Sequence, residues 1–429
     1  MKNRRVASFV SFVAALALAL PLVSPSAAGA RTVSQAGISS DEIKVGGLIE
    51  TQFAQSEVGA QARFADENAK GGVNGRKITY VTGATYAQGN TAAALAEGQR
   101  LVQQEGVAAI VPSLTSVPPT QFLTQQKIPT FAWNITPLGW DNPWFFGITG
   151  SLVAPTPKVA PGSASLPQML GAQLKDEGKP KGGKGATIAI IGSSDASAQS
   201  GIDQAKKTFE HEGYKVTYAK GAFSLTQPTT DYTPFVEAML TSNGGSAPDI
   251  AYLIASFNDV QGLSKGLRQA GFTGIIVNPT TYDPRIIKAA ETLEVYTQWA
   301  TPEAAATVPN VQKVIDSIKK QDPEAALSLG TLAAWFAADM FIQAVKAGGK
   351  NVTTQSIQKA AAKMTYELKG VVGPTTYPTA YTQGTSCAQL AKSNGTTFDV
   401  LVGYACYPAY VFGTGSSSKP VKTIPAPKV

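Results

Sequence analysis

The sequence predicts an α/β fold of two lobes, each built on a doubly wound parallel sheet. The chain has 429 residues, which is more than a single hydrophobic core usually holds, so two lobes are expected. A strand–helix–strand pattern opens the folded part of the chain, and the same pattern restarts midway. Further short apolar segments alternate with helical ones, which is typical of parallel sheets covered by helices on both faces.

The first strand–helix–strand unit begins at the apolar segment Ile43–Ile49. The helix that follows is predicted to place four residues on one buried stripe, namely Val58, Ala62, Ala65 and Ala69. Gly71-Gly72 is expected to end this helix, because glycine adopts the left-handed conformation of a helix cap at little cost. Lys77–Val81 is the next predicted strand, and a right-handed crossover joins it to the first.

The second unit repeats this order. Thr187–Ile191 is a predicted strand, Gly201–Glu212 a helix that ends at Gly213, and Tyr214–Tyr218 the following strand. Other predicted strands are the apolar segments 107–113, 128–133, 249–255 and 274–279. Two long helices are predicted after residue 300, over Asn310–Gln321 and Leu327–Ala347. The proline- and glycine-rich segment 153–167 is expected to cross between the two halves.

The first thirty residues resemble a secretory signal rather than part of the fold. The basic residues Lys2, Arg4 and Arg5 precede the apolar run Val6–Leu20, and small residues end at a cleavage site before Arg31. A membrane anchor is the alternative, but a span needs about 20 apolar residues. No cysteine follows the run, so no lipid anchor is expected. We predict an exported protein in the periplasm, the cell envelope or outside the cell.

Composition excludes several classes of function. The formal net charge is +7, and it is +4 without Lys2, Arg4 and Arg5; the charge forms no basic run, so no nucleic-acid partner is expected. One histidine and two cysteines are too few for a zinc site. A Ser-His-Asp hydrolase would have to use His211, which is expected on a solvated helix face. We therefore predict no metal and no cofactor. The protein is also expected to be a monomer.

The two cysteines, Cys387 and Cys406, are expected to form a disulfide in an exported protein, with two free buried thiols as the alternative. The dipeptide Asn394-Gly395 favours a two-residue hairpin turn, which would place Cys387 opposite Val402. A disulfide would then require a bulge, or a second element that carries Cys406.

Ligands of open parallel sheets bind beyond the carboxyl ends of the strands. Those ends carry hydroxyl, amide and aromatic side chains, which suit a small polar organic ligand. The segment Ser113–Ser116, before Pro118-Pro119, is suited either to a ligand carboxylate or to plain helix capping. Trp133 is expected either to stack on the ligand or to lie in the core, and its place at a strand end favours the ligand site.

Three segments resemble the leucine/isoleucine/valine-binding family of periplasmic binding proteins, the type I solute-binding proteins of ABC importers. They are "IKVGGLI" (43–49), "DENAKGGVNGRKI" (66–78) and "NPWFFGITGS" (142–151). The resemblance implies lobes formed by residues 41–152 with 301–372 and by 156–298 with 376–412, joined by three crossing segments. It implies closure of the lobes on a ligand and delivery to a membrane permease. The tail 413–429 is low in apolar residues and is predicted to be disordered.

The resemblance places the carboxylate contacts of an amino-acid ligand at Ser113 and Thr115 and an aromatic contact at Phe257. The segment that carries an acid for the ligand's ammonium group in amino-acid binders reads Asn278–Tyr282 here, so a carboxylate, amide or aromatic acid is an alternative ligand. The predicted ligand-binding residues are Phe53, Ser113, Thr115, Trp133, Asn134, Thr136, Asp195, Phe257, Thr280 and Tyr282. The expected function is non-enzymatic solute capture for import; a partner of a sensory receptor and a secreted hydrolase are the alternatives.

Overall fold

The structure is a computed structural model that describes residues 37–155, 161–288, 290 and 292–428. The predicted secretory signal lies outside the described residues. The N-terminal part of the described chain forms a five-stranded parallel sheet in the order β2 (Lys77–Val81), β1 (Glu42–Ile49), β3 (Ala109–Leu114), β4 (Thr130–Ala132) and β5 (Phe145–Gly147). Alternate residues of β3 enter opposite cores, since Ala109 and Val111 join one apolar cluster and Ile110 another.

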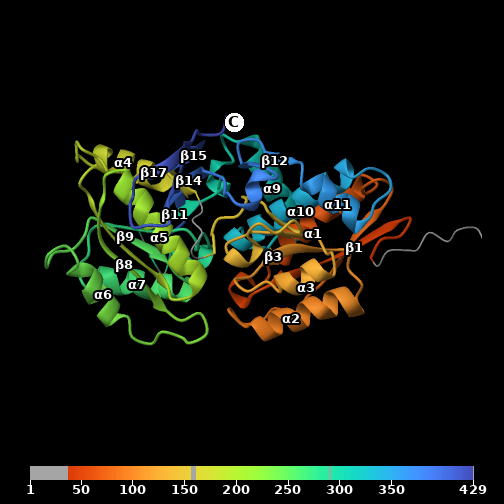
Figure 1. Cartoon of the computed structure of the whole chain (residues 1–429), viewed down its shortest axis with the longest axis horizontal. Coiled ribbons are helices and arrows are strands. Elements are labelled where there is room, and N and C mark those ends of the chain that lie inside the picture. Colours follow the sequence, from red (N-terminus) through yellow and green to blue (C-terminus); the bar gives the residue numbers. More distant parts are fainter. Residues whose placement is uncertain (1–36, 156–160, 289, 291, 429) are drawn as a thin grey trace, which may run out of the picture. The chain divides into compact units, whose positions relative to one another are not determined.

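Helices cover both faces of this sheet (Figure 1). On one side lie α1 (Glu57–Ala69) and α10 (Leu329–Ala347), and the other side carries α2 (Thr91–Gln99) and α3 (Thr120–Gln125). Helices α1 and α10 approach closely at Gly59, where a Cβ atom would collide with the Thr331 carbonyl. Sixteen of the nineteen residues of α10 are buried, so this helix is central to the core.

The predicted stripe on α1 is partly wrong. Ala62 is buried, but Ala65 and Ala69 are exposed, and the buried face runs through Phe64 and Glu67 instead. Glu67 forms ion pairs with Arg63 and Lys346. Pairing allows a carboxylate to be buried against α10. A pattern based on apolar residues alone therefore points to the wrong face.

A second sheet has seven strands in the order β15 (Phe398–Cys406), β14 (Cys387–Ser393), β11 (Leu293–Thr297), β10 (Ile275–Asn278), β9 (Ile250–Ile254), β7 (Thr187–Ser193) and β8 (Lys215–Phe223). Its strands are parallel except β14 and β15, which add an antiparallel edge. One face packs against α4 (Ser165–Asp176) and α5 (Ala196–His211). The other packs against α6 (Thr233–Leu240), α7 (Phe257–Gln269) and α8 (Pro284–Ile287).

The chain passes between the two sheets three times. It leaves the first sheet after β5 and returns to it after β11, through α9 (Pro309–Gln321), α10 and α11 (Thr354–Ala361). The small sheet of β12 (Thr365–Leu368) and β13 (Val372–Thr376) precedes the final passage to β14. This order agrees with the three crossing segments that the resemblance implies; the lobe boundaries stay a prediction. Within the described residues, no helix is long and apolar enough to cross a membrane.

The disulfide between Cys387 and Cys406 is present, and it joins β14 to β15. The two-residue turn is wrong, because Ser393 pairs with Phe398 and four residues therefore form the loop. Two register shifts further along the hairpin then bring Cys387 opposite Cys406. Of the two alternatives expected from the sequence, a bulge or a second element that carries Cys406, the structure has the bulge.

The prediction of a disordered tail is wrong for part of 413–429. Pro420–Ile424 forms β17, which pairs with β16 (Ala409–Phe412), and β16 in turn pairs with β6 (Gly162–Ser163). Edge pairing satisfies backbone hydrogen-bonding groups and needs few apolar side chains. Low apolar content therefore did not identify this strand.

Candidate functional site

A cavity of about 260 Å³ lies at the carboxyl ends of strands from both sheets. From the first sheet come Gln52 and Phe53, which follow β1, and Trp133 and Ile135, which follow β4. The second sheet and its helices supply most of the remaining wall: Ser193, Asp195, Gly201, Gln204, Thr208, Phe209, Tyr252, Ile254, Thr280 and Tyr296. The site therefore occupies the position that parallel α/β sheets generally offer to ligands.

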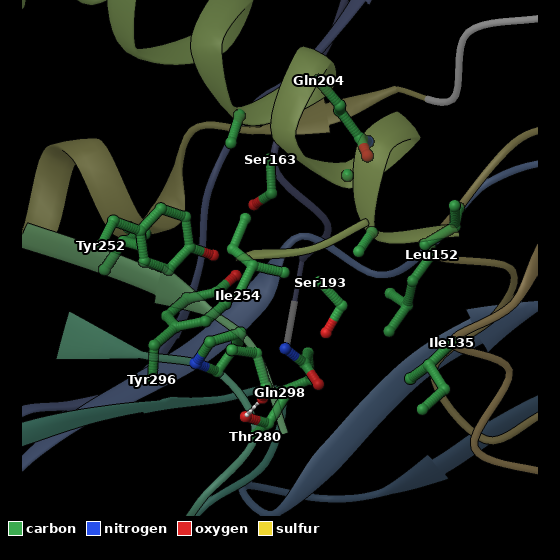
Figure 2. Close-up of a pocket in the computed structure, with 18 of the residues that line it drawn as sticks. Ile135, Leu152, Ser163, Ser193, Gln204, Tyr252, Ile254, Thr280, Tyr296 and Gln298 are labelled. Atoms are coloured by element: carbon green, nitrogen blue, oxygen red, sulfur yellow. Dashed lines mark hydrogen bonds between the residues drawn. The ribbon is translucent and has the colours of Figure 1, made fainter. Parts of the chain in front are cut away.

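Most of the wall is apolar. Figure 2 shows Tyr252 and Tyr296 on one side of the cavity and Leu152 and Ile135 on the other. Both tyrosines belong to the apolar cluster between α4, α5 and the second sheet, so the cavity reaches into that core. Such a wall suits the apolar body of an organic molecule.

A smaller number of polar groups face the same space. Trp133 Nε1 donates to Gln298 Oε1 at 3.2 Å, which links the end of β4 to the segment after β11. Tyr252 Oη has no hydrogen-bond partner among the described residues, and burial raises the pKa of this hydroxyl. The hydroxyl is therefore protonated at neutral pH and remains a donor for a ligand.

Four predicted ligand-binding residues line this cavity, namely Phe53, Trp133, Asp195 and Thr280. The Phe53 and Trp133 rings meet edge to face at 6.2 Å. Asp195 Oδ1 accepts from the Ala198 amide at 3.2 Å, and Thr280 Oγ1 donates to the Ala255 carbonyl at 2.9 Å. Their ligand-binding role remains a prediction, since the geometry only brings them together.

Two other predicted residues, Phe257 and Tyr282, line a neighbouring cavity of about 890 Å³. It shares Gln52, Phe53 and Thr280 with the first. The guanidinium of Arg285 lies 4.6 Å from the centre of the Phe257 ring. Tyr282 Oη donates to the Glu303 carboxylate at 2.8 Å, and burial together with this carboxylate raises the hydroxyl pKa.

The remaining four predicted residues are buried and line neither of these two cavities, namely Ser113, Thr115, Asn134 and Thr136. Asn134 Nδ2 donates to Ser151 Oγ at 2.8 Å, and Thr136 Oγ1 accepts from the Leu138 amide at 3.3 Å. These contacts hold the segment after β4 in place, and a ligand-binding role of the four residues stays a prediction.

The predicted carboxylate site contains the chain's own carboxylate. Glu50, directly after β1, has no exposed surface. Its Oε1 accepts from Thr115 Oγ1 at 3.0 Å, from Ser116 Oγ at 2.6 Å and from the Ser116 amide at 3.0 Å. The Gly89 amide donates to the same atom at 3.2 Å, and Gln52 Nε2 donates to Oε2 at 3.0 Å.

Several cavity residues were missed by the sequence analysis. Tyr296 and Gln298 belong to β11 and the segment after it, and the buried Glu294 interrupts the apolar pattern of that strand. Ser163 and Leu166 lie in a segment that was interpreted as a crossing, although α4 begins there despite Pro167. Proline is tolerated in the first turn of a helix, so Pro167 is compatible with a helix that begins at Ser165. A proline followed by the apolar residues of this segment is the sequence feature that could have predicted α4.

His211 lies at the end of α5, is exposed, and has its ring 4.4 Å from the Tyr410 ring. It does not line the cavity. A hydrolase built on this histidine therefore finds no support in the geometry.

Comparison with known proteins identifies the fold. No curated protein sequence matches the chain. A fatty acid ABC transporter substrate-binding protein from Thermomonospora curvata superposes with a TM-score of 0.68 at 17% identity, over 86% of this chain and 94% of that one. A solute-binding protein from R. palustris in complex with 4-hydroxybenzoate gives 0.65 at 16% identity, over 90% and 98%.

The branched-chain amino acid transporter substrate-binding protein from Streptococcus pneumoniae, in complex with isoleucine, gives a TM-score of 0.63 at 16% identity, over 85% of this chain and 100% of that one. These structures confirm the predicted fold. A family model described as periplasmic binding protein matches residues 43–397. Because this match covers most of the sequence, the chain belongs to the periplasmic binding protein family, whose members bind solutes rather than catalyse reactions.

Proposed function

We propose that this chain is the exported solute-binding protein of an ABC importer and that it captures a small organic solute in the cavity beside Trp133. The observation that carries the proposal is a cavity whose wall combines the ends of β1 and β4 with the second sheet, in a chain of the periplasmic binding protein family. Structural neighbours from importers hold a benzoate or an amino acid, and another is named for fatty acids. These neighbours support an organic solute as the ligand class.

The proposed mechanism is capture by contacts on both sides of the solute. Trp133 and Ile135 offer the apolar wall next to the first sheet, while Tyr252 and Tyr296 offer the wall next to the second. A solute that touches both walls favours the arrangement in which they are close together, because only a difference in affinity shifts such an equilibrium. The loaded form is delivered, as a monomer, to a membrane permease.

A thermal-shift screen of residues 31–429 tests the proposal. A solute at a hundred times its Kd adds about 2.7 kcal/mol to the stability of the folded state, which raises the Tm by several degrees. The library includes amino acids, carboxylates, amides, alcohols and aromatic compounds. We expect one class to raise the Tm of the wild type and not that of Trp133→Ala. Equal shifts for both proteins would show that the solute binds elsewhere and would overturn the proposed site.

The importer role has a separate test. The loaded protein is added to proteoliposomes that contain the permease and ATPase subunits of a candidate ABC importer from the same organism. We expect ATP hydrolysis to rise only in the presence of the solute. A protein that binds its solute and leaves hydrolysis unchanged would contradict the permease partner.

A further inference from the structure

We infer that Glu50 permanently occupies the carboxylate-binding position of this site and that the natural solute is therefore an uncharged molecule with an apolar body. The inference rests on the proposed function and specifies its solute class. It concerns the charge of the ligand, which neither the fold nor the structural neighbours determine for this chain.

The hydrogen-bond donors that follow β3 are already engaged by the Glu50 carboxylate of the same chain. Two hydroxyls and an amide from Thr115 and Ser116 converge on Glu50 Oε1, at distances between 2.6 and 3.0 Å. Such a convergence of donors is what a ligand carboxylate would require. Because Glu50 is completely buried, a second carboxylate here would face both a like charge and donors that are already engaged. Ser116 and Gln52 line the cavity, so Glu50 lies directly behind its wall.

Backbone amides at the N-termini of two helices near the cavity also donate to side chains of the protein itself. At the start of α5, Asp195 Oδ1 accepts from the Ala198 amide at 3.2 Å. At the start of α7, Ser256 Oγ accepts from the Asp259 amide at 3.3 Å and donates to Asp259 Oδ2 at 2.6 Å. The positive ends of both helices thus already face a carboxylate of the chain, which leaves less favourable potential for an anionic ligand.

No cation among the described lining residues compensates for these carboxylates. The described residues that line the cavity include no lysine, arginine or histidine, and Asp195 is their one charged member. Arg285 borders the neighbouring cavity, where it pairs with Asp283 at 2.7 Å and covers the Phe257 ring. An anion would therefore lose its hydration without gaining a counter-charge.

The groups that remain define the expected solute. Tyr252 Oη offers a hydroxyl without a partner among the described residues, and Gln298, which follows β11, offers an amide. Around them lie Leu152, Ile254 and the two tyrosine rings. This combination fits an uncharged ring or short chain that carries one or two hydroxyl, carbonyl or amide groups.

The first test examines the position of Glu50 without knowledge of the solute. Glu50→Ala removes the resident carboxylate and leaves its donors unsatisfied, and formate is added as a small replacement. We expect formate to raise the Tm of Glu50→Ala by several degrees and to leave the wild type unchanged. Glu50→Gln, which keeps the shape of the side chain, is the control and is expected to respond like the wild type. If Glu50→Ala does not fold, its recovery by refolding in formate, compared with chloride, replaces the Tm. The absence of any formate effect would overturn the inference.

The second test compares matched ligands by titration calorimetry: benzamide with benzoate, 4-hydroxybenzamide with 4-hydroxybenzoate, and 1-octanol with octanoate. We expect the uncharged member of at least one pair to bind the wild type at least about tenfold more tightly than its acid. A carboxylate that binds as tightly as its uncharged partner, with loss of binding in Trp133→Ala, would overturn the inference and leave the proposed function intact. If no compound of either kind binds, the solute class inferred here is wrong. If the bound compounds are unaffected by Trp133→Ala, the proposed site is wrong.

Discussion

Trp133 belongs at once to the wall of the cavity and to the core. It is only 3% exposed, its ring meets the Trp299 ring at 5.6 Å, and its Nε1 donates to Gln298. Truncation to alanine would cost about 3–5 kcal/mol of stability. Phenylalanine is therefore the milder replacement, and it separates a loss of affinity from a loss of stability in addition to Trp133→Ala.

For Trp133→Phe we expect the Kd for the solute to rise about tenfold, because the ring shrinks and Gln298 loses its donor. Trp335→Phe is the matched control. Trp335 also lies in the core, and its Nε1 donates to Ser317 Oγ at 2.9 Å, but it does not line the cavity. Both variants should lose stability in urea denaturation, and only Trp133→Phe should lose affinity in calorimetry. An unchanged Kd would assign Trp133 to the core alone.

We expect the stability of the protein to depend on pH through Glu294. The residue is buried in β11, where burial raises the pKa of its carboxyl to about 7, although Gln173 Nε2 donates to it at 2.7 Å and Lys392 lies 3.9 Å away. Because the folded state holds this proton more tightly than the unfolded chain, stability falls as pH rises from about 4.5 to 7. Above the folded pKa the contribution is lost.

Glu294→Gln removes this titration and keeps the size of the side chain. We expect the variant to be more stable than the wild type at pH 8, by up to about 3 kcal/mol, and the difference to vanish near pH 4. Urea denaturation at several pH values measures both curves. Parallel curves for the two proteins would show that Glu294 does not titrate as proposed.

At the scale of elements, the joint between α1 and β2 depends on two glycines with different surroundings. Gly71 has φ +97° and Gly72 has φ +77°, and the Gly72 amide donates to the Glu67 carbonyl at 3.0 Å. A Cβ at Gly72 would collide with the Arg76 carbonyl, whereas a Cβ at Gly71 meets no atom of the described residues within 4 Å.

We therefore expect Gly71→Ala to cost about 1–2 kcal/mol through its left-handed backbone alone. Gly72→Ala should cost more, because the collision adds to the same strain. Urea denaturation of the two variants provides the comparison. Equal losses would show that the backbone conformation, and not the contact with Arg76, requires glycine at position 72.

Strands with apolar runs, such as β7 and β9, could be predicted from the sequence. Strand β11 was not predicted because Glu294 interrupts its apolar pattern. The buried Glu294 carboxyl accepts a hydrogen bond from Gln173 of α4, which is distant in the chain. The register of β14 and β15 depends on two bulges, which local sequence does not specify. The features that could not be predicted therefore depend on contacts between segments that are distant in the chain.

At the scale of the whole molecule, the edge of the sheets that carries the site could be predicted, and its detailed composition could not. Phe53, Trp133, Asp195 and Thr280 follow strands or begin a helix, so topology alone places them at the cavity. Tyr252 points from the middle of an apolar strand and was indistinguishable from a core residue. The hydrogen bonds from Thr115 and Ser116 to Glu50 could not be predicted either, because the fold is what brings these residues together.

The central claim, that the solute occupies this cavity, is tested most directly at Gly201. This residue lies in α5 and lines the cavity, and a Cβ built on it meets no atom of the described residues within 4 Å. A larger side chain there extends into the cavity without displacing backbone, and leucine is a better helix former than glycine.

The measurement is a calorimetric titration of the wild type, Gly201→Ala and Gly201→Leu with the solute found in the screen. We predict a small loss of affinity for alanine and a loss of at least about a hundredfold for leucine, with the Tm of both variants at or above that of the wild type. A Gly201→Leu variant that folds and binds the solute with the wild-type Kd would contradict the account.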